Sequence, residues 1–139
     1  MNRWFYNTSQ PPEIQNYYQK ISSEFCKYYY CLWDKNFPLI GNLYSNDIKI
    51  TFLNRNMNGI LQLINYVKTQ GIWKFNHGIV SGTSQPIDNN TILINIVGEI
   101  AINDSPYYHK YTETLIIKRN IWGDWYITSN IFRLVPFRL

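Results

Sequence analysis

The sequence is poor in the residues from which most catalytic and metal sites are built. Its 139 residues include two histidines, two cysteines and nine acidic residues. No spacing typical of a zinc site, a phosphate-binding glycine loop or a serine nucleophile occurs. Two histidines are also too few for a histidine-rich metal site. We therefore expect no catalytic residues, no metal ion and no cofactor.

Long apolar runs are missing as well. No stretch approaches the roughly 18 apolar residues of a membrane-spanning helix, and the opening MNRWFYNTSQ lacks the apolar core and cleavage site of a secretory signal. Cys26 and Cys31 are five residues apart, so on a helix they would point in different directions, and a disulfide is not expected. We expect a soluble intracellular protein that does not insert into membranes.

Charge is modest, whereas apolar and aromatic residues are abundant. The 13 basic and nine acidic residues leave a net charge of +4, and the basic residues are dispersed, which does not indicate a nucleic-acid surface. A hydrophobic fraction of 45% and an aromatic fraction of 17% exclude a disordered chain. The length predicts one domain over residues 1–139, with residues 1–12 as a loosely ordered extension.

The first half of the chain is predicted to be mainly helical. Pro11 and Pro12 suit the first turn of a helix, and apolar residues then recur at three- and four-residue steps over about twenty residues. A short helix is expected over residues 37–44, a strand over 48–53 and a further helix from Ile60 to near Gly71. The asparagine-rich segment 54–59 is expected to be a turn that ends the strand.

The second half predicts a four-stranded antiparallel meander. Strands are expected over residues 73–80, 92–102, 111–119 and 125–135, with turns at 84–90, 103–106 and 120–124. Gly98 marks a bend or bulge in the second of these strands. Helices followed by a long bent sheet describe an α+β domain. In it, a curved antiparallel sheet wraps around the long N-terminal helix and leaves a cone-shaped hollow at its open end.

Two polar residues are candidates for chemistry in this hollow. His77 falls on the inward side of its strand, beside Trp73 and Phe75. It is either a general base or a core histidine satisfied by one neighbour, and we favour the second interpretation. Asp34 follows the first helix and is expected to be a helix-end or capping residue. Neither residue is strong evidence for an enzyme.

Several strings occur in a particular order over about four-fifths of the chain. The longer ones are Phe25-x-x-x-Tyr29-Tyr30-x-Leu32-Trp33-Asp34 and Trp125-x-x-Thr128-x-x-x-Phe132-Arg133-Leu134. Between them lie Leu43-Tyr44, Thr51-Phe52, His77, Gln85-Pro86 and Ile96-Val97-Gly98. This order and spacing resemble the nuclear transport factor 2 family from about Phe25 to Leu134. The resemblance implies the cone-shaped, cystatin-like fold of that family.

The resemblance also implies a function without catalysis. Members of the family form homodimers through the outer faces of their sheets. They carry the GDP-bound GTPase Ran through nuclear pores and touch Phe-x-Phe-Gly repeats of nucleoporins. This implies a protein of the cytoplasm, the nucleus and the pores of the nuclear envelope. In the family, a phenylalanine of Ran enters the hollow, and acidic residues on its rim hold a lysine of Ran.

The apolar positions of this partner site are mostly kept. The resemblance places its apolar wall at Phe52, Ile72 and Phe132, and it places a nucleoporin-contacting position at Tyr18. The sequence therefore predicts a pocket that accepts an inserted phenylalanine. Residues of the sheet such as Ile92, Ile94 and Tyr111 are expected to suit either a homodimer or a heterodimer.

The acidic rim is largely lost. Three positions that are carboxylates in the family fall at Leu53, Asn103 and Ser105, and only the intervening Asp104 is acidic. A partly desolvated charge pair on such a rim contributes about 10- to 100-fold in affinity. Binding to a lysine of Ran should therefore be weak.

Three functions remain open from the sequence. The first is a transport adaptor that binds Ran-GDP and Phe-Gly nucleoporins as a dimer. The second is a dimeric interaction module on the same fold that no longer binds Ran and recognises Phe-containing peptides or a larger export-factor-like partner. The third, which only His77 and the tyrosines support, is a small-molecule isomerase or dehydratase. We expect the first.

Overall fold

Helices precede a set of long strands in the computed structural model, which describes residues 12–135. The first part of the chain forms helix α1 (Pro12–Lys35), the 3-10 helix η1 (Phe37–Leu43), a hairpin of β1 (Tyr44–Phe52) and β2 (Arg55–Asn58), and helix α2 (Ile60–Thr69). The strands that follow are β3 (Phe75–Asp88), β4 (Thr91–Ile102), β5 (His109–Arg119) and β6 (Trp125–Leu134). The predicted extension over residues 1–12 lies outside the described residues except for Pro12, where α1 begins.

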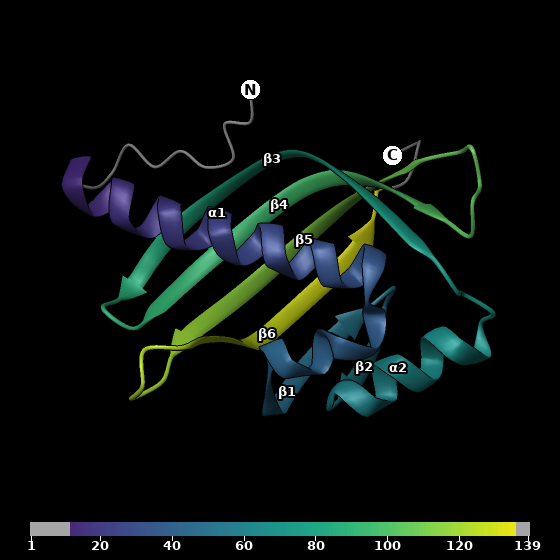
Figure 1. Cartoon of the computed structure of the whole chain (residues 1–139), viewed down its shortest axis with the longest axis horizontal. Coiled ribbons are helices and arrows are strands. Elements are labelled where there is room, and N and C mark those ends of the chain that lie inside the picture. The colour runs from purple at the N-terminus through teal and green to yellow at the C-terminus, as the bar shows by residue number, and fades with distance from the viewer. Residues whose placement is uncertain (1–11, 136–139) are drawn as a thin grey trace.

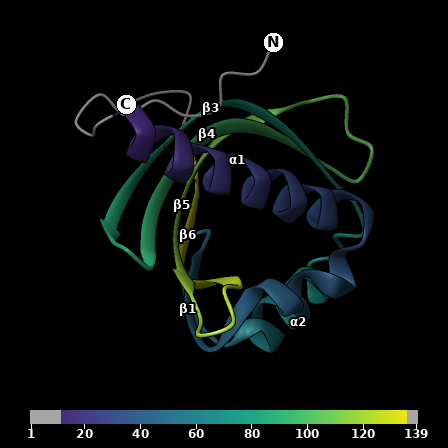
Figure 2. The same cartoon turned by 60° about the vertical axis from the view of Figure 1, so that its left-hand side comes forward.

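The described strands form a single curved sheet in the order β2-β1-β6-β5-β4-β3. The sheet bends around α1, and α2 packs beside the β1–β2 hairpin (Figures 1 and 2). The expected α+β fold is therefore confirmed. However, the sheet is mixed, because β6 pairs in parallel with β1 and antiparallel with β5. No helix in the described part of the chain is both long and apolar enough to cross a bilayer.

One face of α1 packs into the concave side of the sheet. Tyr29, Tyr30 and Trp33 are almost completely buried on this face. Cys26 is buried and Cys31 is exposed, so the two thiols lie on different sides of the helix. The apolar periodicity that predicted the helix thus also identifies the face that forms the core.

Two predicted turns are shorter than expected. The turn in residues 54–59 is confined to Leu53 and Asn54, whose φ angles of 51° and 67° are left-handed, and the chain then returns along β1 as β2. The predicted turn at 84–90 is also mostly strand, since β3 stays paired with β4 as far as Asp88. Polar residues and a proline suggested a loop there, but β3 is an edge strand, where both are tolerated.

Gly98 lies at an irregularity of the sheet, although the bulge itself is in the neighbouring strand. The register between β3 and β4 shifts between Ile79 and Ser81, opposite Gly98. A Cβ on Gly98 would lie 2.6 Å from the carbonyl oxygen of Gly78 and 2.7 Å from the ring of Tyr111. Glycine is required here because the Tyr111 ring lies directly against the strand.

The assignment of residues to the outer sheet face needs correction. Ile92, Ile94 and Tyr111 are completely buried, so they face the core and are not available to a second subunit. The register of the strands instead places Ile116 and Ile131 on the outer face, and Ile131 is 45% exposed. The sequence showed the alternation correctly, but it did not show which side of the sheet α1 covers.

Candidate functional site

Aromatic rings gather where β1 and β6 end together. Phe52 and Phe132 are partners in register, and their rings stack with centroids 5.0 Å apart. Phe132 also stacks on Tyr111 at 5.1 Å, and Phe52 lies 6.2 Å from Trp33 of α1. The two phenylalanines are only 3% and 4% exposed. The structure therefore brings together two of the residues predicted to line the pocket, as part of a packed aromatic cluster.

Half-buried apolar residues lie around this ring pair. The backbone N–H of Leu53 donates to the carbonyl of Phe132 at 3.1 Å, and the ring of Tyr66 on α2 meets Phe52 edge-on at 6.1 Å. Ile72, just after α2, packs against the same core. We call this end of the molecule, formed by residues 52–55, 66–74, 103–105 and 132–134, the mouth. Most of it lies on the right-hand side of Figure 1.

The side chain of Asn103 links two segments of the mouth by hydrogen bonds, because it bonds the backbone of residues 71–74. Its Oδ1 accepts hydrogen bonds from the backbone N–H groups of Trp73 (2.8 Å) and Lys74 (3.2 Å), and its Nδ2 donates to the carbonyl of Gly71 (2.9 Å). Its φ of 54° is left-handed, a conformation that asparagine tolerates better than most residues. The predicted rim position is thus occupied by a structural amide. No local sequence pattern predicts this role of Asn103, because its hydrogen-bond partners are about 30 residues away in the sequence.

The remaining acid of the rim is paired within the chain. Asp104 Oδ1 lies 2.7 Å from Nζ of Lys74, and the hydrogen bond together with the nearby negative charge raises the pKa of Lys74. Both side chains are about half exposed or more, so the pair adds little to stability. It does neutralise the one carboxylate that the resemblance left on the rim. Ser105 Oγ accepts from the backbone N–H of Tyr107 at 3.2 Å.

Arg55 is a cation at the mouth that the sequence did not reveal. It pairs with Phe52 in the β1–β2 register and therefore lies on the same face of the sheet as that ring. Its guanidinium carbon is 5.0 Å above the ring of Tyr66. Among the described residues no carboxylate forms an ion pair with it. Because the asparagines of residues 54–59 predict a turn, no strand alternation assigns Arg55 to this face from the sequence.

The predicted nucleoporin-contacting residue lies mostly below the surface. Tyr18 is 9% exposed, and its ring meets that of Tyr17 edge-on at 5.0 Å. Tyr17 is 49% exposed, and its hydroxyl accepts a hydrogen bond from Nη1 of Arg119 at 2.9 Å. Any surface contact at this point of α1 would therefore reach Tyr17 before Tyr18.

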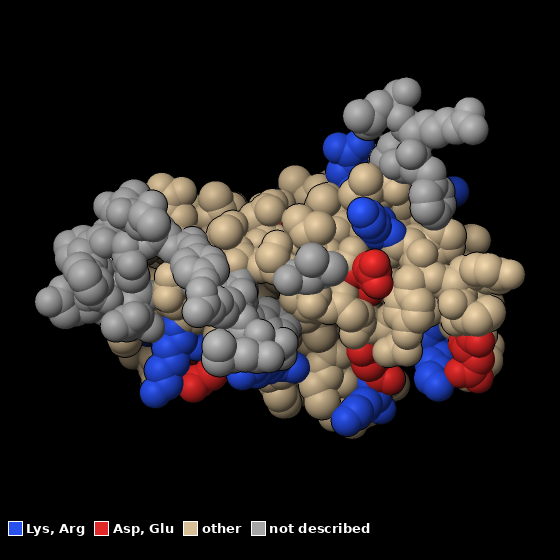
Figure 3. All heavy atoms as spheres, turned by 90° about the horizontal axis from the view of Figure 1, so that it is seen from above, with Lys and Arg blue, Asp and Glu red and all other residues tan. Residues whose placement is uncertain are grey.

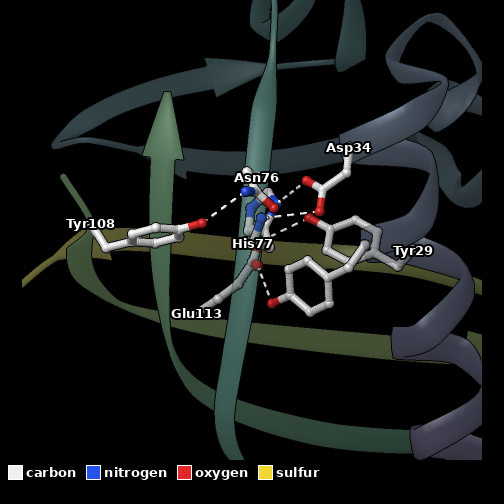
Figure 4. Close-up of polar contacts among 7 residues, drawn as sticks. Tyr29, Asp34, Asn76, His77, Tyr108 and Glu113 are labelled. Atoms are coloured by element: carbon white, nitrogen blue, oxygen red, sulfur yellow. Dashed lines mark hydrogen bonds and ion pairs between the residues drawn. The ribbon is translucent and has the colours of Figure 1, made fainter. Parts of the chain in front are cut away.

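His77 is a core histidine held by one neighbour, as favoured above. Its side chain is 3% exposed, and its Nδ1 lies 2.6 Å from Oδ1 of Asp34 (Figure 4). The backbone N–H of His77 donates to the other carboxylate oxygen at 3.0 Å. Asp34 is at the end of α1, as predicted, but it binds β3 and not the helix end. Trp73, expected beside His77 on the inner face, lies outside β3 and is 67% exposed.

A buried glutamate, which the sequence reading missed, lies at the centre of the inner face. Glu113, drawn with Tyr29 in Figure 4, is 2% exposed. It accepts hydrogen bonds from the hydroxyls of Tyr29 (2.8 Å) and Tyr30 (2.6 Å) and from Nδ2 of Asn130 (2.8 Å). Burial raises the pKa of this carboxyl, and the hydrogen bonds from Tyr30 and Asn130 oppose that effect. The alternation of β5 contained the signal, since Glu113 shares its face with Tyr111 and Leu115. The network joins α1 to β5 and β6.

A recess lies at the other end of β1 and β6. It has a volume of about 730 Å³ and is lined by residues 42–47, Asn120 and 124–126. Asp47 and Asp124 are among its lining residues, and neither forms an ion pair with another described residue. Within residues 12–135 we find no group of three or more His, Cys, Asp or Glu side chains that could hold a metal ion.

Charged side chains are mixed on the face seen in Figure 3. Lysine and arginine are scattered there, and several lie beside an aspartate or glutamate. This agrees with the dispersed basic residues of the sequence.

Comparisons with known proteins agree on one family. The model of the nuclear transport factor 2 domain matches residues 21–134. Nuclear transport factor 2 of Candida albicans is 29% identical over 119 residues, which cover 84% of this chain and 94% of that protein. The structure of nuclear transport factor 2 from Cryptosporidium parvum is 22% identical, has a TM-score of 0.76, and is matched over 84% of this chain and 93% of that one.

The same fold occurs in a protein described as an enzyme. A proposed scytalone dehydratase from Novosphingobium aromaticivorans has a TM-score of 0.67 at 11% identity, with 84% of this chain and 82% of that chain covered. At this level of identity the likeness concerns the fold alone.

Proposed function

Because the chain belongs to the nuclear transport factor 2 domain family, we propose that it is a dimeric, non-enzymatic adaptor in nucleocytoplasmic transport that docks partner proteins at its mouth. The mouth carries this proposal: half-buried Leu53, Tyr66 and Ile72 lie around the stacked rings of Phe52 and Phe132. An aromatic side chain of a partner could pack on such a surface. The inner polar groups argue against catalysis, because His77 and Glu113 are already held by neighbouring side chains.

The partners to test first are those that family membership suggests. They are a Ran-type GTPase in its GDP form, at the mouth, and Phe-Gly repeats of nucleoporins, at Tyr18 or its more exposed neighbour Tyr17. Such a protein would work in the cytoplasm, in the nucleus and at nuclear pores. Titrating the protein with Ran, loaded once with GDP and once with a GTP analogue, tests the proposal. Binding of the GDP form alone supports it.

A second candidate keeps the dimer and the mouth but not the GTPase. The contacts of Asp104 favour it, since the one rim carboxylate is already bound to Lys74. In this case the protein would bind Phe-containing segments or a larger partner, and neither form of Ran would bind.

Rebuilding the acidic rim should strengthen binding to Ran-GDP. We expect the double variant Lys74→Gln, Ser105→Asp to bind about tenfold more tightly than the wild type, because it frees Asp104 and adds a second carboxylate. An aspartate at 105 can still accept the Tyr107 N–H. Asn103→Asp is unsuitable, since it would replace the Nδ2 donor to Gly71 with an oxygen. Unchanged affinity in calorimetry would refute the electrostatic explanation of weak binding.

The outer sheet face should form the dimer. Ile116 and Ile131 are apolar residues of this face, and a lysine at either position would be buried without a partner charge in the interface. We therefore expect the wild type to sediment as a dimer and the variant Ile116→Lys, Ile131→Lys as a folded monomer. Leu61→Lys, on the exposed side of α2, is the matched control and should stay dimeric. A dimeric double variant with normal circular dichroism would exclude this face.

A further inference from the structure

We propose that the mouth recognises a phenylalanine carried in an acidic segment of its partner, with aspartate or glutamate next to the aromatic residue. This inference rests on the proposed function, because it assigns a charge preference to the same docking surface.

The first argument is the balance of charge around the mouth. The segments that form it contain Arg55, Lys68, Lys74 and Arg133, and their one acidic residue is Asp104. Asp104 is bound to Lys74 at 2.7 Å, so these two charges cancel locally. The remaining charges of these segments, on Arg55, Lys68 and Arg133, are positive. A surface of this kind attracts an acidic segment and repels a basic one.

The second argument is the position of Arg55. It lies on the face of the sheet that Phe52 occupies, and its guanidinium carbon lies 5.0 Å over the ring of Tyr66, which in turn meets Phe52 edge-on. This cation–π contact keeps the guanidinium over the ring, and its N–H groups can bind a carboxylate with two parallel hydrogen bonds. A partner ring packed against Tyr66 and Leu53 would place an adjacent carboxylate within reach of Arg55.

The third argument is the lack of acceptors for a basic partner. Leu53 is apolar, Asn103 Oδ1 already accepts two backbone N–H groups, and Ser105 Oγ accepts one. A lysine beside the inserted ring would therefore meet Arg55 without a free carboxylate among the described residues of the mouth. Like charges in this arrangement lower affinity.

The opposite end of the strands carries charges of both signs. The recess there is lined by Asp47 and Asp124, which have no ion-pair partner in the described part of the chain. Lys118 and Arg119 pair in register with Tyr126 and Trp125, which also line the recess, so this end carries two cations as well as the two anions. An acidic segment would be steered toward the mouth.

Three short peptides test the proposal on the full-length wild-type protein. They are Ac-Gly-Glu-Phe-Glu-Gly-NH2, its lysine counterpart Ac-Gly-Lys-Phe-Lys-Gly-NH2, and Ac-Gly-Glu-Ala-Glu-Gly-NH2, which lacks the ring. Titration followed by amide NMR shifts gives the affinity and the location. We expect the glutamate–phenylalanine peptide to bind about tenfold more tightly than either control, to shift resonances at the mouth, and to weaken with added salt.

Two charge variants make the test specific. Arg55→Gln should lower the affinity for the glutamate–phenylalanine peptide about tenfold and remove its advantage over the lysine peptide. Lys49→Gln removes the same charge from the outer face, where Lys49 bonds Asn58, and should leave both affinities unchanged. Equal losses in the two variants would mean that only net charge matters, and this would overturn the proposal.

The outcomes separate the inference from the proposed function. Tighter binding of the lysine peptide at the mouth overturns the charge preference and leaves the docking function intact. Equal binding of the alanine peptide overturns the role of the ring. If no peptide shifts resonances at the mouth, both the charge preference and the docking site fail.

Discussion

Replacing Glu113 by alanine should lower the free energy of unfolding by about 3 kcal/mol. The carboxylate is 2% exposed and accepts hydrogen bonds from Tyr29, Tyr30 and Asn130. Alanine would leave all three donors without this acceptor in a site that water hardly reaches. Urea unfolding monitored by tryptophan fluorescence measures the effect. A loss below about 1 kcal/mol, the typical value of a single hydrogen bond, would show that the network contributes little.

Glu113→Gln removes the titrating group, although it also replaces one of the two acceptor oxygens with an N–H donor. Burial raises the pKa of Glu113 in the folded state, so the folded protein keeps this proton at pH values at which the unfolded chain has lost it. The carboxyl therefore favours folding below its ordinary pKa of about 4.3, and this contribution is lost as the pH rises through the folded-state value. Glutamine does not titrate. Relative to the wild type, the glutamine variant should gain stability as the pH rises above about 4. A difference that does not change with pH would contradict the assigned pKa direction.

Phe132→Ala should remove partner binding and also lower the free energy of unfolding by about 3–5 kcal/mol. The ring is 4% exposed and stacks on Phe52 and Tyr111, so its loss leaves a cavity beneath the mouth. A loss of binding alone would therefore not distinguish a missing partner contact from a destabilised fold. Differential scanning calorimetry and a binding titration have to be made on the same preparation.

Ile127→Ala is the matched control for this substitution. Ile127 is completely buried on the same strand, but it pairs with Tyr44 at the far end of β6. We expect a loss of stability of the same order and normal partner binding. If Phe132→Ala binds its partner as well as Ile127→Ala does, the mouth is not the docking site.

The alternation and periodicity of the sequence predict the helices and strands better than they predict how these elements pair. The apolar stripe of α1 and the alternation of β4 and β5 predicted elements that the structure contains, within a few residues at their ends. The parallel pairing of β1 with β6 was not predictable, because no local pattern records which strand becomes a neighbour 80 residues later. The asparagines of residues 54–59 favour a turn, whereas four residues of this segment pair with β1 in the structure.

The candidate site shows the same division. Phe52 and Phe132 were recognised from the resemblance, and the structure stacks them. The role of Asn103 depends on backbone groups of another segment, and the position of Arg55 depends on a strand that was taken for a turn. Glu113 differs from these two, since the alternation of β5 already placed a charged residue on the buried face. A charged residue on the otherwise apolar face of a predicted strand is the sequence signal that identifies Glu113.

The position of β6 between β1 and β5 has a consequence for biosynthesis. The β1–β2 hairpin is synthesised well before its sheet neighbour, which consists of residues 125–134. Until β6 has left the ribosome, β1 has no partner except β2, and the inner face of the sheet lacks Phe132 and Asn130. Folding of this sheet can therefore be completed only after residues 125–134 have been synthesised, and a nascent chain that stops before residue 125 leaves an open edge on β1 and another on β5.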